Sequence, residues 1–343
     1  MLIRAKAPLR LGLAGGGSDV APYCDLYGGA VLNASINLSS YCTIEPCDDG
    51  TVTFVATDRE EVFSAPCATE YAYDGLLDLH KGVYNRIVRD FNNGEPLSLK
   101  ISTHSDAPAG SGLGSSSTMV VAILTAFAEL LHLPLGEYDV AHLAFEIERM
   151  DIGLRGGAQD QYAATFGGVN FMEFHEQNRV TVNPLRIKKW ILSELEASTV
   201  LYYTGVSRSS DMIIAQQIES FKSGQGKSVE AVHQLKQDAS AMKDALLRGN
   251  IRRFGEILGR SWEAKRHLAD KISNPQIEEV MNVALQAGAW AGKVSGAGGG
   301  GFIMFIVDPV ERVQLIRTLN QQDGDVVPFQ FEPHGACAWN VPT

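Results

Sequence analysis

The sequence has no cysteine framework and no long apolar run. Its five cysteines are odd in number and scattered, and no two form a Cys-x-x-Cys pair, which favours reduced thiols over disulfides. The longest apolar run, residues 119–131, contains Thr125 and Glu129 and is too short to span a bilayer. Charged residues interrupt the apolar start of the chain, so we expect no secretory signal and a cytoplasmic protein.

Positive charge is also scarce. Lys and Arg number 29 against 40 Asp and Glu, which gives a net charge of -11 at pH 7. Such a surface repels phosphate backbones and anionic lipids, so neither a nucleic acid nor a membrane is expected as a partner. The chain also lacks a His-Glu-x-x-His motif, a Cys/His cluster and a Gly-x-Ser-x-Gly elbow, which argues against zinc sites and hydrolase triads.

The composition is that of a globular protein. Apolar residues make up 45% and charged residues 20% of 343 residues, with a mean hydropathy of -0.04. This length predicts about two domains, and we place them at residues 1–186 and 187–343. The first part mixes short strands with two helices. Long amphipathic helices dominate the second part before a strand-rich end, so the predicted fold class is α+β.

Several elements follow from local patterns. Alternating residues at 31–46 and 51–56 flank a turn signal and predict a hairpin. Residues 97–102 predict another strand, and residues 115–132 a largely buried helix. In the second part, Asn274 before Pro275 predicts the start of a helix that ends near 287–288. The chain is then expected to form a strand at 302–307, a helix at 309–320 and a last strand at 326–331.

A glycine- and serine-rich loop runs directly into the helix expected from residue 115. Glycines let the backbone approach an anion closely, and the first helical N–H groups point toward it. Serine hydroxyls add hydrogen bonds or a Mg²⁺ ligand. The alternative is a loop that only supplies a serine N-cap. The Lys-Ser/Thr pair of a Walker loop is missing. The candidate anion-binding residues are Pro108, Gly110, Ser111, Gly112, Leu113, Gly114, Ser115, Ser116 and Ser117.

A second glycine cluster occupies residues 295–301 and satisfies Gly-x-Gly-x-x-Gly through Gly296, Gly298 and Gly301. Dinucleotide fingerprints open a helix, whereas an apolar strand follows here, so a dinucleotide site is disfavoured. Two interpretations remain: a hairpin turn without function, or a loop packed against a ligand or against the first glycine loop.

Two acidic residues stand in glycine-flanked turns. Asp19 follows three glycines, with Arg10 upstream, and this combination suits a polyhydroxylated substrate. Asp160 follows Gly156 and Gly157, and a fixed carboxylate of this kind can take a proton from an alcohol. The alternative for each is an N-cap, for a helix from residue 20 or for the segment 161–166.

Together these clusters resemble the GHMP small-molecule kinases, which include galactokinase, homoserine kinase, mevalonate kinase and phosphomevalonate kinase. The motif Pro-x-Gly-Ser/Ala-Gly-Leu-Gly-Ser-Ser matches residues 108–116, the late motif matches 293–302, and the resemblance covers nearly the whole chain. The early segment, 7–19, departs from the Gly-Glu-His of galactokinase and mevalonate kinase. Together with segments 23–35, 159–162 and 203–210, it is similar to the D-glycero-D-manno-heptose 7-phosphate kinases and related sugar kinases.

The resemblance implies an N-terminal domain like ribosomal protein S5 domain 2 and a ferredoxin-like C-terminal domain, with ATP and a sugar between them. ATP phosphates would lie on the loop at 108–117, and Ser116 and Glu148 would ligate Mg²⁺. Asp160 would be the base, and Arg10 would stabilise negative charge. Implied substrate-binding residues are Gly16, Gly17, Ser18, Asp19, Gly298, Gly299 and Arg208, with Arg155 as a second candidate for a sugar phosphate.

The implied reaction phosphorylates a hydroxyl, expected to be anomeric, of D-glycero-D-manno-heptose 7-phosphate. Its 1,7-bisphosphate product would serve nucleotide-activated heptose and surface glycan synthesis. The alternatives are a kinase for an unphosphorylated sugar such as fucose or galactose, and a non-catalytic sugar sensor on the same fold.

Overall fold

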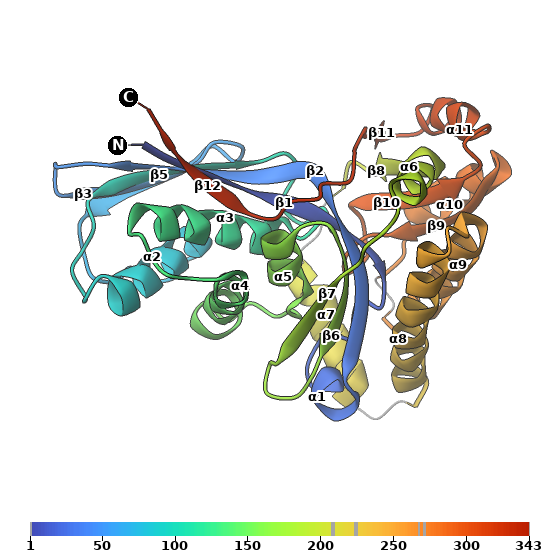
Figure 1. Ribbon diagram of the computed structural model, residues 1–343, viewed down its shortest axis with the longest axis horizontal. Helices are drawn as coiled ribbons and strands as arrows, with labels where there is room; N and C mark the ends of the chain where they lie inside the picture. Colours follow the sequence, from blue (N-terminus) through green and yellow to red (C-terminus); the bar gives the residue numbers. More distant parts are fainter. Residues whose placement is uncertain (1, 207–209, 223–225, 267, 270–271, 343) are drawn as a thin grey trace.

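Two β-sheets organise the chain, and helices pack on both (Figure 1). The computed structural model describes residues 2–206, 210–222, 226–266, 268–269 and 272–342. The larger sheet has eight strands in the order β12-β1-β2-β5-β3-β4, with β6 paired to β2 and β7 paired to β6. The smaller sheet has four strands in the order β11-β8-β10-β9. This mixed arrangement confirms the α+β class.

The strands of the larger sheet are β1 (Leu2–Ala14), β2 (Gly29–Pro46), β3 (Thr51–Ala56), β4 (Glu61–Pro66), β5 (Leu99–Ser105), β6 (Val169–Phe174), β7 (Val180–Pro184) and β12 (Cys337–Val341). Those of the smaller sheet are β8 (Thr199–Tyr203), β9 (Ala289–Val294), β10 (Phe302–Val307) and β11 (Asp325–Val326).

The helices of the first part are α1 (Tyr23–Tyr27), α2 (Asp78–Phe91), α3 (Ser115–Leu130), α4 (Glu137–Glu146), the π-helix η1 (Ile147–Asp151) and α5 (Gln159–Phe166). The later helices are α6 (Lys189–Ser198), α7 (Ser210–Lys222), α8 (Gly226–Leu247), α9 (Ile251–Arg266), α10 (Pro275–Gln286) and α11 (Arg312–Leu319). Within the described residues, none of them is long and apolar enough to cross a membrane.

Most locally patterned elements form where they are expected. The helix predicted from residue 115 is α3, the strand predicted at 302–307 is β10, and the helix predicted at 309–320 is α11. Asn274 caps α10, because its side chain accepts a hydrogen bond from the backbone N–H of Ile277 at 3.0 Å. These elements depend on caps and short-range periodicity, which a sequence displays directly.

The hairpin expected from residues 31–46 and 51–56 is wrong. Strand β5 lies between β2 and β3, antiparallel to the first and parallel to the second. Strand β3 instead forms its hairpin with β4. An alternating pattern identifies a strand and its buried side but does not choose its partner. A strand that returns after α2 can therefore separate two neighbours in the sequence.

The last strand expected at 326–331 is also wrong. Only its first residue lies in a strand, β11, and the true last strand is β12, which pairs antiparallel with β1. The two ends of the chain consequently lie side by side on the larger sheet (Figure 1). The C-terminal strand thus lies in the sheet built mainly by the first part of the chain, although its residues fall within the predicted second domain. The division at residue 186 stays a prediction.

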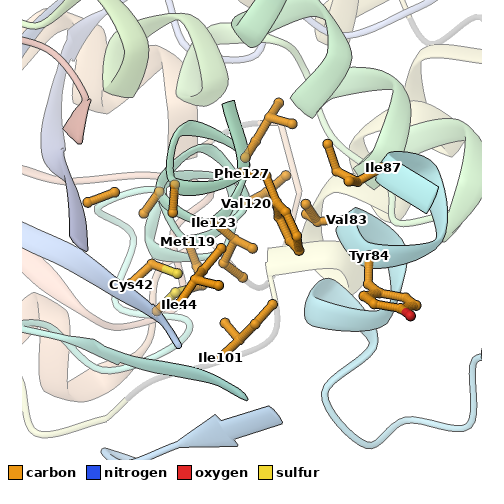
Figure 2. Packing of buried hydrophobic residues seen from close by; sticks show 14 of the residues in the cluster. Cys42, Ile44, Val83, Tyr84, Ile87, Ile101, Met119, Val120, Ile123 and Phe127 are labelled. Atoms are coloured by element: carbon orange, nitrogen blue, oxygen red, sulfur yellow. The ribbon is translucent and has the colours of Figure 1, made fainter. Parts of the chain in front are cut away.

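One hydrophobic core lies between the larger sheet and helices α2 and α3. Figure 2 shows Met119, Val120, Ile123 and Phe127 of α3 packed among side chains of α2 and of the strands. Both sides of α3 are covered, since it contacts the sheet as well as α2, α4 and α5. Its apolar composition follows from that position, and the core fixes the direction in which the start of α3 points.

A second core joins the two sheets. Leu9, Leu11 and Leu13 of β1 belong to the same buried cluster as Phe254 of α9 and Met304 of β10. Burying such side chains contributes about 1.5–3 kcal/mol each relative to exposure. The cluster therefore holds the end of β1, and the loop that follows it, against α9 and the smaller sheet.

Candidate active site

A cavity of about 450 Å³ opens where the two parts of the chain meet. Its wall includes the end of β1 with the loop after it, the start of α3, η1, the start of α5, α7, α9 and the loop after β9. All four glycine-rich or acidic clusters of the sequence contribute to this wall, through Asp19, Gly112, Asp160 and Gly296 among others. Segments far apart in the sequence thus form a single site.

The glycine and serine loop reaches the cavity at the start of α3. Gly110, Gly112 and Gly114 have φ angles of 73°, 83° and 79°, in the left-handed region that favours glycine. Gly114 is the N-cap of α3, and no side chain caps the helix. This rules out the interpretation of a loop that only places a serine cap. The first N–H groups of α3, on Ser115 and Ser116, have no partner within the helix and carry its positive dipole end, so the loop fits an anion.

The late glycine cluster packs on this loop of residues 108–117, named the phosphate loop below because it fits an anion. A Cβ on Gly112 would lie 2.4 Å from the carbonyl oxygen of Ser295, and a Cβ on Gly301 would lie 2.1 Å from that of Ser111. Two hydrogen bonds lock the contact: the Ser295 hydroxyl donates to the Gly112 carbonyl at 2.9 Å, and the Phe302 N–H donates to the Ser111 carbonyl at 3.0 Å. Of the two interpretations of this cluster, the contact supports packing against the first glycine loop.

Arg10 connects the phosphate loop to Asp160. Its Nε donates to Oδ1 of Asp160 at 2.7 Å, and its Nη2 lies 2.6 Å from the same oxygen. Its Nη1 donates to the Gly112 carbonyl at 2.6 Å. Arg10 lies on β1 between two irregularities in the pairing with β2, a feature that re-aims side chains beside active sites. The guanidinium is buried and holds both partners in place.

Asp160 lies in the first turn of α5, whose N-cap is Ala158. It is therefore not the helix cap that one interpretation of the sequence expected. Its carboxylate faces the phosphate loop, since a Cβ on Gly114 would lie 3.1 Å from both Cγ and Oδ2 of Asp160. A carboxylate beside an anion cradle is positioned to accept a proton from a nucleophile that attacks a bound phosphate.

Glu148 forms a second acidic position, on the π-helix η1. One carboxylate oxygen accepts a hydrogen bond from the Ser116 hydroxyl at 2.9 Å, and the other accepts one from the Gln161 amide. Arg149 Nη1 lies 3.6 Å from the first oxygen. Glu148 is buried, and π-helical turns often occur at functional sites. The arrangement presents hard oxygen atoms next to the first turn of α3.

The early loop brings Asp19 into the cavity. Oδ1 of Asp19 accepts the Gly17 N–H at 3.0 Å, and Gln159 approaches both carboxylate oxygens at 3.4 Å. Burial, with a smaller contribution from the negative charge of Asp160, raises the pKa of Asp19. Its position, with Pro22 rather than Asp19 capping α1, excludes the N-cap interpretation.

Two amides near the early loop have buried polar atoms without partners among the described residues: Oε1 of Gln159, which lies at Asp19, and Nε2 of Gln217, which lies near Gly17. Both residues line the cavity. An unsatisfied buried amide carries a free-energy cost that a ligand hydroxyl removes. This corner of the cavity therefore suits a hydroxyl-rich molecule.

Two buried lysines complete the electrostatics. Lys265 of α9 lines the cavity and donates to the Gly296 carbonyl, and burial, followed by the positive charge of Arg10, lowers its pKa to about 8. Lys293 of β9 donates to the carbonyls of Gly12 and Leu13 at 2.6 and 3.0 Å. Burial and the charge of Lys265 lower the pKa of Lys293 well below its usual value.

Comparisons with known proteins agree with this geometry. Residues 78–168 match the GHMP kinases N terminal domain, and residues 242–325 match the GHMP kinases C terminal domain. The chain is 50% identical over 339 residues to the D-glycero-alpha-D-manno-heptose 7-phosphate kinase of Campylobacter jejuni, with 99% of both chains covered. The chain belongs to the GHMP kinases.

Two further relatives of this GHMP kinase are informative. A crystal structure of a D-glycero-D-manno-heptose 1-phosphate kinase from Bacteriodes thetaiotaomicron superposes with a TM-score of 0.85 at 50% identity, covering 99% of this chain and 100% of the other. The L-fucokinase/L-fucose-1-P guanylyltransferase of Bacteroides fragilis is 25% identical over 93% of this chain and 36% of its own length. The relatives confirm the expected kinase family and the two-domain GHMP fold.

Several residues predicted for the site lie elsewhere or play another part. Ser18 is fully buried, and its hydroxyl oxygen lies within hydrogen-bond distance of the carbonyls of Gly15 and Ala30, at 2.8 and 3.0 Å, so it shapes the loop from inside. Gly298 and Gly299 pack against Ile272 and are not among the residues that line the cavity. Three residues of the phosphate loop are also not among those that line the cavity: Pro108, Ser111 and Leu113.

The remaining predicted residues line the cavity, apart from one. Gly16, Gly17, Ser117 and Arg155 are part of its wall. Arg208 lies outside the described residues. The roles of all these residues as ligands stay predictions.

Sequence reasoning missed four polar side chains of the cavity: Arg149, Gln159, Gln217 and Lys265. A signal for Lys265 exists, because it continues the apolar stripe of α9 through Leu258 and Trp262 at helical spacing. A lysine on a buried stripe calls for an anionic or carbonyl partner. The other three carry no pattern of their own and become visible only when the loops meet.

Proposed function

We propose that this GHMP kinase transfers the γ-phosphoryl group of ATP to the anomeric hydroxyl of D-glycero-D-manno-heptose 7-phosphate, giving the 1,7-bisphosphate and ADP. The observation that carries the proposal is the meeting of Asp160 with the phosphate loop at Gly114. Phosphoryl transfer depends on positioning and charge neutralisation, and the cavity supplies both.

Asp160 accepts the hydroxyl proton in this proposal. The sugar oxygen then forms a bond to the γ-phosphorus as the bond to the bridging β–γ oxygen breaks, and ADP leaves with the electrons of that bond. Arg10 orients the carboxylate through Oδ1, where both of its contacts fall, and places its own charge beside the developing negative charge. The Arg10 contact to Gly112 keeps the phosphate loop in register with the base.

The residues present fit Mg²⁺ and ATP. Glu148 and Ser116 offer a carboxylate and a hydroxyl, the hard oxygen donors that Mg²⁺ takes together with substrate phosphates and water. The ion would supply charge neutralisation on the phosphates. Gly112 and Gly114 allow the phosphate loop to pack against Ser295 and Asp160, because a Cβ at either glycine would lie within 3.1 Å of those residues.

The acceptor is inferred from the cavity and the relatives together. Asp19, Gln159 and Gln217 suit sugar hydroxyls, and Arg155 adds a cation on the same wall. Two relatives at 50% identity are described as heptose phosphate kinases, although their names place the phosphate at position 7 in one and position 1 in the other. We assign the 7-phosphate as substrate, with Arg155 or Arg208 as its cation. All five cysteines are free thiols, which supports a cytoplasmic enzyme.

The test measures ADP release with Mg²⁺ and ATP across D-glycero-D-manno-heptose 7-phosphate, fucose, galactose and mevalonate. High kcat/KM on the heptose phosphate alone supports the proposal. Turnover confined to fucose or galactose keeps the mechanism and overturns the acceptor. No turnover of any compound in the panel would favour a sugar sensor. The presence of Arg10, Ser116, Glu148 and Asp160 in one cavity argues against a sensor.

A further inference from the structure

Lys265 is a buried ammonium with few partners. Its side chain lies at the end of α9, is 4% exposed and lines the cavity. An ammonium has three N–H donors, and the structure gives one of them a partner, the Gly296 carbonyl. Within the described residues it forms no ion pair with a carboxylate, whereas Asp160 is paired with Arg10 and Glu148 with Arg149. A buried charge with spare donors calls for an anion.

The position of Lys265 indicates which anion. Gly296, its partner, touches the phosphate loop, since a Cβ on Gly296 would lie 2.6 Å from Cα of Gly112. Arg10 donates to the carbonyl of that same Gly112. Arg10 of β1 thus contacts Gly112 directly, and Lys265 of α9 contacts Gly296, which packs on Gly112. Two cations from different parts of the chain therefore hold the two glycine loops where they touch.

We propose that Lys265 binds the phosphoryl group that is transferred, through an oxygen of the terminal phosphate of a nucleoside triphosphate. This inference rests on the proposed kinase function and adds a catalytic residue to it. Lys265 and Arg10 together neutralise charge on the transferring group, while Oδ2 of Asp160, which Arg10 does not contact, accepts the proton. The bonds made and broken are those of the phosphoryl transfer above, and Lys265 keeps its proton throughout.

A purely structural role makes a different prediction. If Lys265 only held the late glycine loop, Lys265→Met would lower thermal stability and weaken every ligand. The proposal predicts the opposite for stability, because Met removes the cost of burying an ammonium while keeping most of the packing. The Tm of Lys265→Met should then equal or exceed that of the wild type, because replacing a residue that serves function often stabilises the fold.

Calorimetry separates the terminal phosphate from the rest of the nucleotide. With Mg²⁺, we expect Lys265→Met to bind the non-hydrolysable β,γ-imido analogue of ATP roughly 10- to 100-fold more weakly than the wild type, the loss typical of a charged hydrogen bond. ADP, which lacks the terminal phosphate, should bind both proteins equally. Lys265→Arg should retain part of the affinity. The matched control is Lys243→Met, which removes a lysine that lies over the Phe171 ring outside the cavity.

Binding of the acceptor tests whether Lys265 contacts the phosphate of heptose 7-phosphate instead of the terminal phosphate of the nucleotide. Lys265→Met should lower kcat by about 10²- to 10³-fold, as loss of one donor to a transition state does, and leave the Kd of heptose 7-phosphate unchanged. Weaker binding of heptose 7-phosphate together with unchanged binding of the imido analogue would overturn the proposal and assign Lys265 to the acceptor phosphate. Equal effects on ADP and the analogue, or none, would also overturn it. If the wild type phosphorylates the heptose and Lys265→Met gives either of these two results, the proposed kinase function stands and only the role of Lys265 is refuted.

The pH dependence supplies a further readout. The charged groups that face Lys265 are Arg10 from β1, Asp19 from the loop after it, Asp160 from α5 and Lys293 from β9. Since the pKa of Lys265 is about 8, the fraction protonated falls above pH 8. The Kd of the imido analogue should rise above pH 8 in the wild type and stay flat in Lys265→Met. A rise of the same size in both proteins would contradict the assignment.

Discussion

Gly157 and Asp19 are in contact so close that only a glycine fits: a Cβ on Gly157 would lie 1.9 Å from Oδ2 of Asp19. Gly157 also accepts hydrogen bonds from Arg149 at 3.2 and 3.3 Å through its carbonyl. The turn before α5 and the loop after β1 thus pack directly against each other in the wall of the cavity. This contact couples the position of Asp19 to that of Asp160, three residues after Gly157.

The first prediction follows from that contact. In Gly157→Ala the added methyl group displaces the Asp19 carboxylate, so the KM for heptose 7-phosphate should rise several-fold while the KM for ATP changes little. Steady-state kinetics with each substrate varied in turn measures both. The control is Gly136→Ala, where a Cβ has ordinary room, 3.4 Å from Asp139. An unchanged acceptor KM in Gly157→Ala would contradict the placement of Asp19 at the sugar.

The second prediction concerns the metal. Ser116→Ala removes a hydroxyl that hydrogen-bonds Glu148, so half-maximal activity should need about tenfold more Mg²⁺, the size of loss seen when the surroundings of metal ligands are altered. Titration of activity with Mg²⁺ at fixed ATP checks it. Ser64→Ala, at an exposed position on β4, serves as the control. Identical Mg²⁺ curves for Ser116→Ala and the wild type would exclude Ser116 from the metal site.

The third prediction concerns Arg86 of α2, which clamps the π-helix that carries Glu148. Its guanidinium contacts Glu146, just before η1, at 2.8 Å and Asp151, the last residue of η1, at 2.8 and 2.9 Å. Arg86→Met should lower the free energy of unfolding by roughly 3 kcal/mol, because carboxylates that are partly buried lose their partner.

It should also raise the Mg²⁺ requirement, because the π-helix loses the clamp that aims Glu148. Urea denaturation and the Mg²⁺ titration measure the two effects. Arg89→Met is the control, since that side chain is exposed and forms its ion pair with the neighbouring Asp90. A stable variant with normal Mg²⁺ dependence would show that the clamp does not position Glu148.

The fourth prediction concerns acid stability. His80 lies in the core under the larger sheet, where its Nε2 is 2.8 Å from the Thr103 hydroxyl. Burial, followed by the charge of Arg59, lowers the pKa of His80 from 6.5 to about 4. Between these values the unfolded chain binds a proton that the folded chain does not, so the free energy of unfolding falls as pH falls from 6.5 toward 4.

His80→Gln should lose less stability over this window than the wild type. Urea denaturation at pH 7 and pH 5 measures the difference for both proteins. The control is His132→Asn, which replaces an exposed histidine with a residue that tolerates its positive φ of 52°. Parallel losses in His80→Gln and the wild type would place the acid sensitivity elsewhere.

How much of this architecture a sequence can reveal depends on the range of each interaction. The phosphate loop and α3 were predictable because glycines, serines and an apolar stripe follow one another directly in the chain. The neighbours of β2 were not, because strand pairing is chosen by the packing of distant segments. Strand β12 was missed for the same reason, since its five partly exposed residues gain their order from distant segments, by pairing with β1 and packing on α3.

The site residues likewise include some that the sequence predicts and others that only the fold reveals. Asp19, Ser116, Glu148 and Asp160 were predicted because glycine-rich turns or family motifs mark them. Lys265 is 105 residues beyond Asp160 in the sequence and enters the cavity only because the core shared by β1, α9 and the smaller sheet brings α9 to the phosphate loop. Residues of this kind are found by asking why a charged side chain lies on a buried stripe.

The most direct test of the central claim is ³¹P NMR of heptose 7-phosphate incubated with Mg²⁺, ATP and the enzyme, beside Asp160→Asn and the surface control Asp244→Asn. We expect a new phosphomonoester signal coupled to the anomeric proton, with the 7-phosphate signal retained, for the wild type and Asp244→Asn. Asp160→Asn should bind ATP but form this product about 10²- to 10⁴-fold more slowly. Wild-type product formation by Asp160→Asn, or ATP consumed without a new sugar phosphate, would contradict the account.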